Sequence, residues 1–334
     1  MKAVGYLESL PITEANALLD IEVPKPEASG HDILVNVKAI SVNPVDTKVR
    51  RGGNPPEGEY KILGWDATGV VETVGEQVTL FKTGDKVWYA GAINRQGTNA
   101  EYHLVDERIT AKMPQSLDYA DAAALPLTGI TAWELLFARF NLHQDSKGTI
   151  LIIGGAGGVG SIMIQLVKKL TQLDVIATAS RPETVKWVKS LGVDEVINHR
   201  ESLVAELKRI GAKPINYIAS LTHTVDHFAE IVEIIAPQGK IGLIEGGNPV
   251  DIQPLMSKSV SVHWELMFTR PMFATEDMIE QHNLLTQLAK MIDDGEIQTT
   301  IGENFGKINA ANLMKAHALI ESGKAKGKIV LAGF

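Results

Sequence analysis

The fold follows from one short segment, Ile150-Leu151-Ile152-Ile153-Gly154-Gly155-Ala156-Gly157-Gly158-Val159-Gly160, in which an apolar strand-like run enters a glycine cluster. Gly155, Gly157 and Gly160 have the spacing G-x-G-x-x-G. In this motif the first glycine makes a tight turn, the second lets backbone approach a pyrophosphate, and the third lets helix and strand pack closely. A glycine spacing alone is often only a flexible loop. Here it lies between a buried strand and a helical pattern, which favours dinucleotide binding.

The residues after the glycines predict a helix with one apolar face, made by Ile162, Met163, Leu166, Val167 and Leu170. The unpaired N–H groups and the positive dipole end of such a helix attract phosphate oxygens. We therefore predict that the cofactor's pyrophosphate binds at Gly155, Gly157, Gly158, Val159 and Gly160.

Composition excludes several classes of protein. A chain of 334 residues is expected to form two domains. Its net charge of −8, without a basic cluster, argues against nucleic acid or an anionic membrane as a partner. The sequence contains no cysteine, which excludes disulfides, thiolate nucleophiles and cysteine-based zinc sites. Without a signal-like or bilayer-spanning apolar run, we expect a cytoplasmic protein.

The first part of the chain, up to about residue 125, is rich in short strand patterns, for example at 33–40, 69–75 and 85–90. Gly, Asp and Asn turns separate them. Many short strands of this kind are typical of a barrel or a partly open sheet. From Tyr119 the pattern becomes helical.

The middle of the chain alternates strands with helices. Strands are predicted at 149–153, 174–179, 195–198, 215–220 and 239–245, and helices at 159–171, 182–191, 201–210 and 224–235. Such alternation predicts parallel pairing with right-handed crossovers, so the fold class is α/β with a doubly wound parallel sheet.

Residues 260–268 alternate apolar with mostly polar side chains and are expected to form the last strand of this sheet. A long apolar edge strand invites pairing with another chain. We therefore expect a symmetric homodimer joined along 260–268.

The tail predicts two helices, at 278–293 and 310–322, and a closing strand at 328–331. One domain is thus inserted in another. The expected limits are 127–269 for the nucleotide-binding domain, and 1–126 with 270–334 for the other.

The end of the second predicted strand indicates which nucleotide binds. About twenty residues after the glycines an NAD site places Asp or Glu against the ribose 2′-hydroxyl, whereas this sequence has Ser180-Arg181. A guanidinium pairs with a 2′-phosphate, which no carboxylate here repels, so we predict NADP(H). The alternative is a solvent-facing arginine that starts a helix at Pro182. His199 and Arg200 are expected to add positive charge near the adenosine.

Three further stretches, 43–52, 64–75 and 125–133, carry a family resemblance. Together with the glycine loop they resemble the medium-chain dehydrogenase/reductase superfamily, specifically the zinc-type alcohol dehydrogenase-like members of its quinone oxidoreductase branch. The resemblance covers the whole chain. It implies a GroES-like catalytic domain split around a Rossmann domain, with the active site in the cleft.

The sequence departs from the zinc enzymes of that superfamily at the metal ligands. Asn43 stands where they carry a zinc-binding cysteine, Trp65 where they carry a histidine, and Ala124 near the third ligand. The four-cysteine structural lobe is missing, and the remaining Asp66 does not make a site. We expect no catalytic zinc.

A second metal candidate is the pair His223 and His227, which would share one helical face. A zincin requires Glu after the first histidine, and Thr224 stands there. We favour a helix start capped by Thr222 or Thr224.

The resemblance and the missing Lewis acid suggest the chemistry. Without a metal an alkoxide is poorly stabilised, and Val45 replaces the family's proton-relay Ser or Thr. Hydride transfer from NADPH to a quinone or enone is easier, because the conjugated carbonyl spreads the incoming charge. The alternatives are a zinc-dependent alcohol dehydrogenase and a non-catalytic NADPH-binding sensor or crystallin-like protein.

Three candidate residues would lie near the nicotinamide. Asn43 is expected to bind its ribose or the substrate carbonyl, unless it is only a turn residue. Thr128 matches a family threonine beside the nicotinamide, and otherwise caps the helix before Trp133. Lys328 matches a C-terminal motif near the cofactor, and otherwise is simply solvated.

Three weaker candidates complete the catalytic set. Asp46 is assigned either a catalytic role or a structural ion pair with a residue such as Arg50. Trp65 is expected to fill the vacated metal pocket and line the substrate cavity. Tyr60 is a candidate proton donor, with water as the alternative acid.

Overall fold

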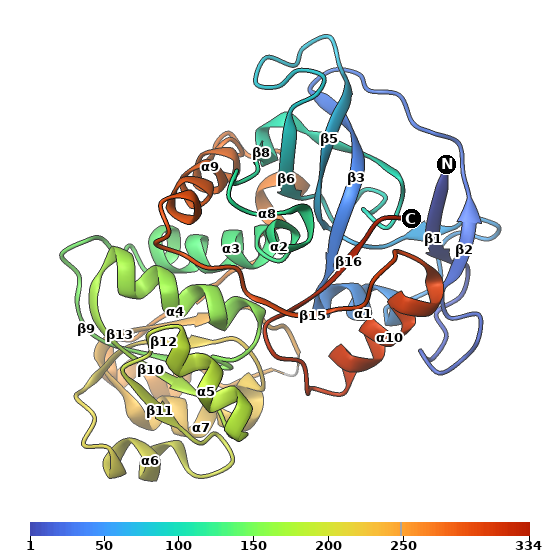
Figure 1. Cartoon of the computed structure of the whole chain (residues 1–334). Coiled ribbons are helices and arrows are strands. Elements are labelled where there is room, and N and C mark those ends of the chain that lie inside the picture. The colour runs from blue at the N-terminus through green and yellow to red at the C-terminus, as the bar shows by residue number, and fades with distance from the viewer. Residues whose placement is uncertain (248) are drawn as a thin grey trace. The chain divides into compact units, whose positions relative to one another are not determined.

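The computed structural model describes residues 1–247 and 249–334, and the chain divides into two compact units (Figure 1). Unit 1 comprises Met1–Ile130 and Phe268–Phe334, and unit 2 comprises Thr131–Met267. The inserted unit therefore begins at 131 and ends at 267, where we had predicted 127 and 269.

Unit 1 contains two sheets. The larger sheet has the order β15-β16-β3-β5-β6-β8, with β7 also paired to β3, and the smaller has the order β2-β1-β4. The strands are β1 (Lys2–Tyr6), β2 (Leu19–Glu22), β3 (Asp32–Val42), β4 (Lys61–Ile62), β5 (Asp66–Val74), β6 (Lys86–Ala90), β7 (Tyr102–Asp106), β8 (Thr110–Lys112), β15 (Ile301–Asn304) and β16 (Lys328–Ala332).

Strand β3 organises unit 1. It pairs antiparallel with β5, where Ser41 lies opposite Asp66, and with β16, where Val42 lies opposite Ile329. The end of β3 therefore lies between the starts of two strands that are distant in the sequence. This register builds the polar cluster described below.

The helices that belong to unit 1 or start in it are α1 (Pro44–Arg51), α2 (Tyr119–Ala123), α3 (Pro126–Trp133), α8 (Thr269–Phe273), α9 (Glu280–Asp293) and α10 (Ala310–Glu321), with a 3₁₀ turn at Glu107–Ile109. The two helices and the closing strand predicted for the tail are thus confirmed as α9, α10 and β16. Helix α1 packs against α10, and a buried guanidinium on Arg50 pairs with Glu321.

Unit 2 is a six-stranded, wholly parallel sheet with the order β11-β10-β9-β12-β13-β14. Its strands are β9 (Lys147–Ile153), β10 (Gln172–Thr178), β11 (Glu195–Ile197), β12 (Ile215–Ser220), β13 (Ile235–Leu243) and β14 (Ser261–Trp264). The chain runs outward from β9 to β11 and then returns to β12. The strand order therefore reverses between β9 and β12, which is where doubly wound sheets bind ligands.

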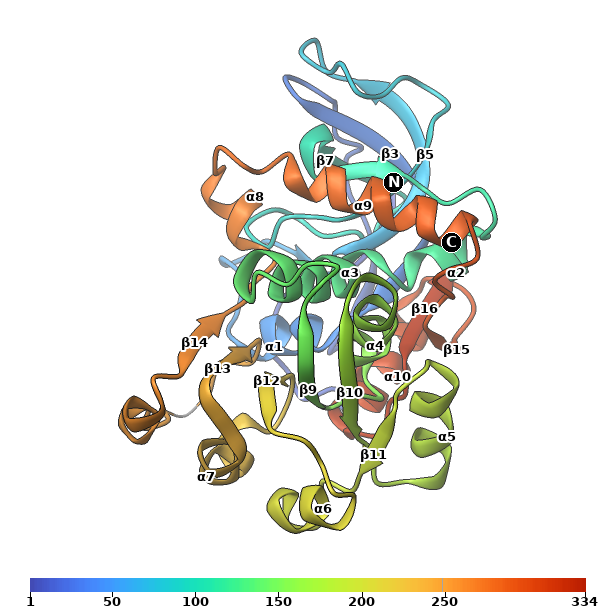
Figure 2. The same cartoon turned by 90° about the vertical axis from the view of Figure 1, so that its left-hand side faces the viewer.

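Helices cover both faces of this sheet. They are α4 (Gly158–Leu170), α5 (Pro182–Ser190), α6 (Leu203–Arg209) and α7 (Thr224–Ile234), with a π-helix at Glu134–Arg139 and a 3₁₀ turn at Gln253–Lys258. Figure 2 shows α4 and α5 on one side of the strands and α6 and α7 on the other. The doubly wound sheet that we predicted is confirmed.

The last strand of unit 2 is shorter than predicted. Of residues 260–268, only Ser261–Trp264 form β14. Its neighbour β13 ends at Leu243, which is paired with Trp264, so in the described part of the chain β13 offers no further residue opposite those beyond Glu265. The predicted edge position is correct.

The predicted cap of α7 is wrong. His223 itself occupies the N-cap position, with φ 52° and ψ 34°, and its side chain makes no capping bond. The hydroxyl of Thr222 bonds the His223 ring, while that of Thr224 bonds Ser220. Both hydroxyls are therefore engaged elsewhere.

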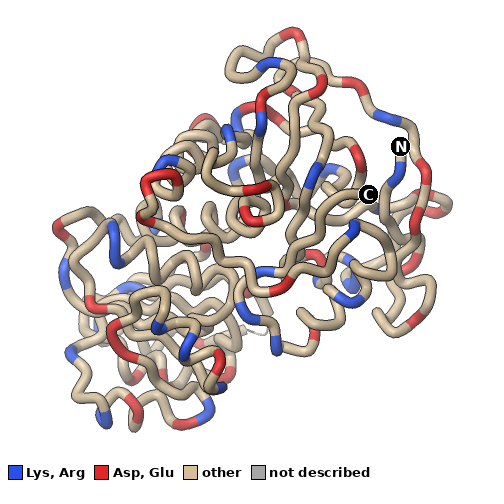
Figure 3. The backbone as a smooth tube through the Cα atoms, viewed as in Figure 1, with Lys and Arg blue, Asp and Glu red and all other residues tan. Residues whose placement is uncertain are grey.

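Charged residues of both signs are interspersed along both units (Figure 3). Within the described residues, no helix is both long and apolar enough to cross a membrane.

Candidate functional site

Asn43 is the N-cap residue of α1. Its backbone is extended, with φ −125° and ψ 160°, as a residue before proline prefers. Its N–H donates to Asp46 Oδ2 at 2.7 Å. Asp46 therefore holds the backbone at Asn43, and the ion pair that we considered between Asp46 and Arg50 is wrong, because Arg50 turns to Glu321.

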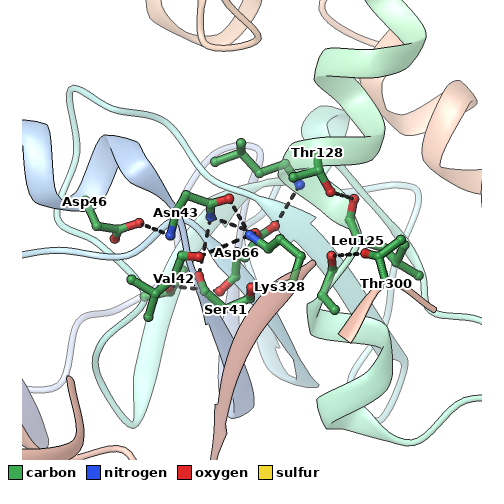
Figure 4. Close-up of polar contacts among 12 residues, drawn as sticks. Ser41, Val42, Asn43, Asp46, Asp66, Leu125, Thr128, Thr300 and Lys328 are labelled. Carbon is green, nitrogen blue, oxygen red and sulfur yellow. Dashed lines mark hydrogen bonds and ion pairs between the residues drawn. The ribbon is translucent and has the colours of Figure 1, made fainter. Parts of the chain in front are cut away.

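The side chain of Asn43 lies in a buried cluster with Asp66 and Lys328 (Figure 4). The Asn43 amide nitrogen donates to Asp66 Oδ2 at 2.8 Å, and its oxygen accepts from the Lys328 ammonium. Lys328 Nζ lies 3.0 Å from Asp66 Oδ2 and 3.3 Å from the Val42 carbonyl. Lys328 is 3% exposed, so the solvated alternative for this residue does not hold.

Asp66 also ties this cluster to the start of α3. Its Oδ1 accepts the N–H of Leu127 at 2.7 Å, where a carboxylate at a helix amino end is favourable. The next residue, Thr128, is buried and donates its hydroxyl to the Leu125 carbonyl at 3.2 Å. Thr128 lies inside α3 and does not cap it. Sequence reasoning had set Asp66 aside as a lone surviving carboxylate.

The cluster contains a carboxyl group that titrates near neutrality. The pKa of Asp46 is raised to about 7, first of all by burial; the hydrogen bond from Asn43 and the charge of Lys328 oppose this rise, and the charge of Asp66 adds to it. Close to pH 7 this side chain is therefore present in both protonation states.

In unit 2 the three glycines of the turn differ in the space around them. A Cβ on Gly160 would lie 2.5 Å from the Gly154 carbonyl oxygen, and one on Gly155 would lie 2.7 Å from the Ala177 Cβ. On Gly157 the nearest atom would be 3.5 Å away, so this backbone is open to a ligand. The left-handed residue is Gly154, with φ +91°, and not Gly155, to which we had assigned the tight turn.

Gly158 and Val159 begin α4 and are partly exposed. In the described part of the chain, no side chain caps this helix. Its first N–H groups are therefore without a side-chain acceptor, as a pyrophosphate site requires.

Basic side chains follow β10 and β11. Ser180 and Arg181 lie between β10 and α5, and the partly buried Arg181 guanidinium pairs with Glu183 at 3.1 Å. His199 and Arg200 follow β11. The pKa of His199 is lowered by burial and then by neighbouring positive charges, among them Arg200 and Arg181. The structure thus brings together the residues that we predicted for the 2′-phosphate.

Two family profiles match the chain. Residues 29–115 match the alcohol dehydrogenase GroES-like domain, and residues 191–331 match the zinc-binding dehydrogenase family. The chain is 42% identical to a zinc-type alcohol dehydrogenase-like protein of Staphylococcus aureus, over 99% of both chains. It is 31% identical to a quinone oxidoreductase of Lama guanicoe, over 93% of this chain and 91% of the relative.

The chain belongs to the medium-chain dehydrogenase/reductase superfamily, in its quinone oxidoreductase branch. It is therefore an oxidoreductase with a GroES-like domain and a Rossmann domain, as predicted.

Solved structures agree. A Rhizobium etli protein, described provisionally as a zinc-dependent alcohol dehydrogenase, has a TM-score of 0.96 and 55% identity and covers 100% of this chain and 98% of its own. The mycobacterial protein Rv1454c, solved with NADPH, has a TM-score of 0.84 and 26% identity, over 99% of this chain and 100% of its own.

The residues at the family's zinc-ligand positions are engaged in other contacts. Trp65 is completely buried; its indole N–H donates to the Ala92 carbonyl at 3.2 Å, and its ring meets Phe268 edge to face at 5.7 Å. Ala124, near the third position, is also fully buried. Among the described residues there is no group of three His, Asp or Glu side chains that could hold a metal ion.

Tyr60 lies away from the polar cluster. It is 36% exposed and lines a cavity of about 490 Å³ together with Met1 and Arg95. The hydrogen bonds of Asn43, Asp66 and Lys328 do not involve it. The structure therefore gives no support to Tyr60 as the proton donor.

Sequence reasoning missed a buried carboxyl pair in unit 2. Glu134, in the π-helix, and Glu265, just after β14, are 1% and 2% exposed and lie close enough to interact. Arg139 Nε lies 2.8 Å from Glu265 Oε2. Burial, followed by the charge of Glu134, raises the pKa of Glu265 well above its usual range. Neither glutamate belongs to a local motif, so no sequence signal marks the pair.

Proposed function

We propose that this protein transfers hydride from NADPH to a quinone or α,β-unsaturated carbonyl without zinc. One observation supports the zinc-free part of this proposal. At the two principal ligand positions, the Asn43 amide is bonded to Lys328 and Asp66, and the Trp65 indole offers a bound N–H and no lone pair. Zinc requires thiolate, imidazole or carboxylate ligands, so the residues present do not fit it.

The residues of unit 2 fit NADP(H). The uncapped amino end of α4 and the open backbone of Gly157 suit the pyrophosphate, and the basic residues after β10 and β11 suit a 2′-phosphate. The NADPH-bound mycobacterial relative supports a nicotinamide cofactor. The proposed contacts are those of Gly155, Gly157, Gly158, Val159, Gly160, Ser180, Arg181, His199 and Arg200.

For the reacting end of the cofactor we propose Asn43, Thr128 and Lys328. A bound nicotinamide supplies the hydride, and the protein supplies position and electrostatics. The Lys328 ammonium is the buried positive charge of this cluster, and it holds the Asn43 amide while Asp46 holds the Asn43 backbone. Asp46 is thus a positioning residue in this proposal. Quinone, hydride and one proton give the hydroquinone, and we propose water as the source of the proton.

The test is to incubate the purified protein with NADPH and separate quinones, enones and alcohols, and to follow nicotinamide absorbance. Oxidation of NADPH by quinones or enones is expected, with activity unchanged after chelator treatment. One tightly bound zinc per chain, lost together with activity, would establish the zinc-dependent alternative. Binding of NADPH without oxidation by any acceptor would favour a sensor.

We also propose a homodimer joined along β14. This strand lies at the edge of the sheet, and Trp264 and the nearby Leu266 are 59% and 46% exposed. Ile252 and Met256 are also exposed, at 55% and 77%. An edge strand with apolar side chains is suited to two-fold pairing with a second copy.

We propose a cytoplasmic location for the protein. The chain has no cysteine and so needs no oxidising compartment, which agrees with this location.

A further inference from the structure

We propose that His199 and His227, with His223 beside them, form a wall of the 2′-phosphate site, which takes up a proton when NADP(H) binds. As a result, the preference for NADP(H) over NAD(H) would strengthen as the pH falls. This inference rests on the proposed cofactor, and it gives a role to the His223/His227 pair that the sequence first suggested as a metal site.

The topology places all three histidines at one edge of the unit 2 sheet. His199 follows β11, and His223 follows β12 as the N-cap residue of α7. His227 lies one helical turn further on. Because the strands are parallel, these positions share the carboxyl edge with the glycine turn after β9. A Cβ on Gly154 would lie 3.0 Å from Thr222 Cγ2, so the loop that carries His223 lies against the glycine turn.

The three histidines and the two arginines are also close in space. The charges of His227, Arg200, His223 and Arg181 all lower the pKa of His199, after burial. The ring nitrogen Nδ1 of His199 is buried and has no hydrogen-bond partner among the residues that the structure describes. The rest of the side chain is partly exposed, and a phosphate oxygen that approaches the exposed part of the ring would stabilise the protonated imidazole.

His223 shows a second sign of a functional site. Its backbone lies in the left-handed region, which few residues other than glycine adopt and which is often retained at binding sites. Its N–H donates to Glu245 at 2.8 Å, and its ring bonds Thr222. These contacts hold the His223 ring at the start of α7.

The acidic groups around the histidines already have partners or lie at the helix start. Glu183 pairs with Arg181, Glu230 accepts from Ser202, and Glu245 accepts from His223. Burial lowers the pKa of His227, the charge of Glu230 raises it, His223 lowers it, and Asp226 in the first turn of α7 raises it. An anion at this edge therefore meets Arg181, Arg200 and the three histidines, with the carboxylates of Glu230 and Asp226 beside His227.

The direction of the pH effect follows from charge. The lowered pKa of His199 leaves it neutral at pH 7 in the free protein. A nearby phosphate dianion favours the imidazolium and raises the pKa, so NADPH binding takes up a proton. NADH has no 2′-phosphate and takes up none. One linked proton strengthens NADPH binding by up to about tenfold per pH unit, as the pH falls toward about 6, where phosphate itself protonates.

The test is calorimetric titration of the full-length protein with NADPH and NADH, near pH 7.2, in buffers with different ionisation enthalpies. We expect proton uptake with NADPH and none with NADH. His199→Gln should lose the uptake and the pH slope while keeping NADH affinity, which also shows that it is folded. His199→Lys, with a permanent charge, should keep the preference for NADPH without the slope.

The matched control is His143→Gln, an exposed histidine that precedes β9 and so lies at the opposite edge of the sheet. It should behave like the wild type. NADPH binding without proton uptake, or equal uptake with NADH, would overturn the inference and leave the proposed cofactor intact. A protein that binds NADH but not NADPH would overturn the proposed cofactor itself.

Discussion

Lys328 and Asp66, 262 residues apart in the sequence, form an ion pair with Nζ 3.0 Å from Oδ2 inside unit 1. The Lys328 side chain is 3% exposed and that of Asp66 is 0% exposed. Asp66 also receives hydrogen bonds from Asn43 and Leu127. A buried pair adds little net stability, but removing one partner leaves the other charge uncompensated.

Lys328→Met should therefore destabilise the protein by about 3–5 kcal/mol, measured by urea unfolding. The Asp66→Asn change in the same background removes the orphaned carboxylate and should recover part of this loss. A single Lys328→Met variant within about 0.5 kcal/mol of wild type would show that water reaches Asp66 and that the cluster is not sealed.

Asp46 gives unit 1 a pH-dependent stability. Its pKa of about 7 in the folded protein lies above the unfolded value of about 3.9. The folded state therefore binds the proton more tightly. The stability that Asp46 contributes is complete below about pH 4 and is lost as the pH rises through 7.

Asp46→Asn retains an oxygen that can accept from the Asn43 N–H but does not titrate. Between pH 4 and 7 the melting temperature of this variant should fall less than that of the wild type. At pH 8 its free energy of unfolding should exceed that of the wild type by a few kcal/mol at most, on the order of 1.4 kcal/mol per pKa unit. Glu57→Gln, at an exposed position of the same unit, is the control. If both variants showed the wild-type pH profile, Asp46 would be ionised throughout this range.

Glu265 should behave in the same direction in unit 2. Burial, and after it Glu134, raises the pKa of Glu265, so the folded state binds the proton of this carboxyl more tightly than the unfolded state does. The free energy of unfolding should therefore fall as the pH rises from about 4.5 through neutrality. In Glu265→Gln the amide can donate to Glu134 and accept from Arg139. We expect a higher melting temperature at pH 8 than in wild type and a flatter profile. Lower stability at every pH would mean that both carboxylates are ionised.

The sequence allowed unit 2 to be predicted closely because its signals are local. Apolar runs such as 149–153 and the amphipathic pattern of 159–171 depend on near neighbours alone, and they match β9 and α4 within two residues. The edge strand was predicted too long because its end depends on where β13 stops. The end of β13 lies far from 260–268 in the sequence, so no pattern within 260–268 reveals it.

The polar cluster shows the same limit. Asn43 and Lys328 were candidates through family resemblance, but their contact depends on β16 and β5 pairing on opposite sides of β3. No local pattern contains that register. Asp66 was therefore undervalued, although it joins the cluster to α3. Arg50 was given the wrong partner for the same reason, since Glu321 lies on a helix far along the chain.

The homodimer predicts a specific sensitivity at the sheet edge. Trp264→Glu places a charge on the exposed side of β14 and should convert the protein to a monomer in gel filtration with light scattering. Phe273→Glu, in unit 1, is 69% exposed and provides a matched control that should leave the dimer intact. A wild-type protein that is monomeric at micromolar concentration would overturn the proposal.

Alanine substitutions at Gly157 and Gly160 should distinguish an effect on ligand binding from an effect on folding. Alanine at 160 would push its Cβ into the backbone at Gly154 and Gly155, and overpacking of this kind costs about 1–3 kcal/mol. Alanine at 157 meets its nearest atom only at 3.5 Å, and Gly→Ala at an N-cap costs at most about 1 kcal/mol.

Gly157→Ala should therefore fold almost normally yet weaken NADPH binding at least about tenfold, or about 1.4 kcal/mol, because its methyl group stands where the pyrophosphate approaches. Thermal melting and cofactor titration of both variants check this. If Gly157→Ala bound NADPH as tightly as wild type, the pyrophosphate would not lie on this turn.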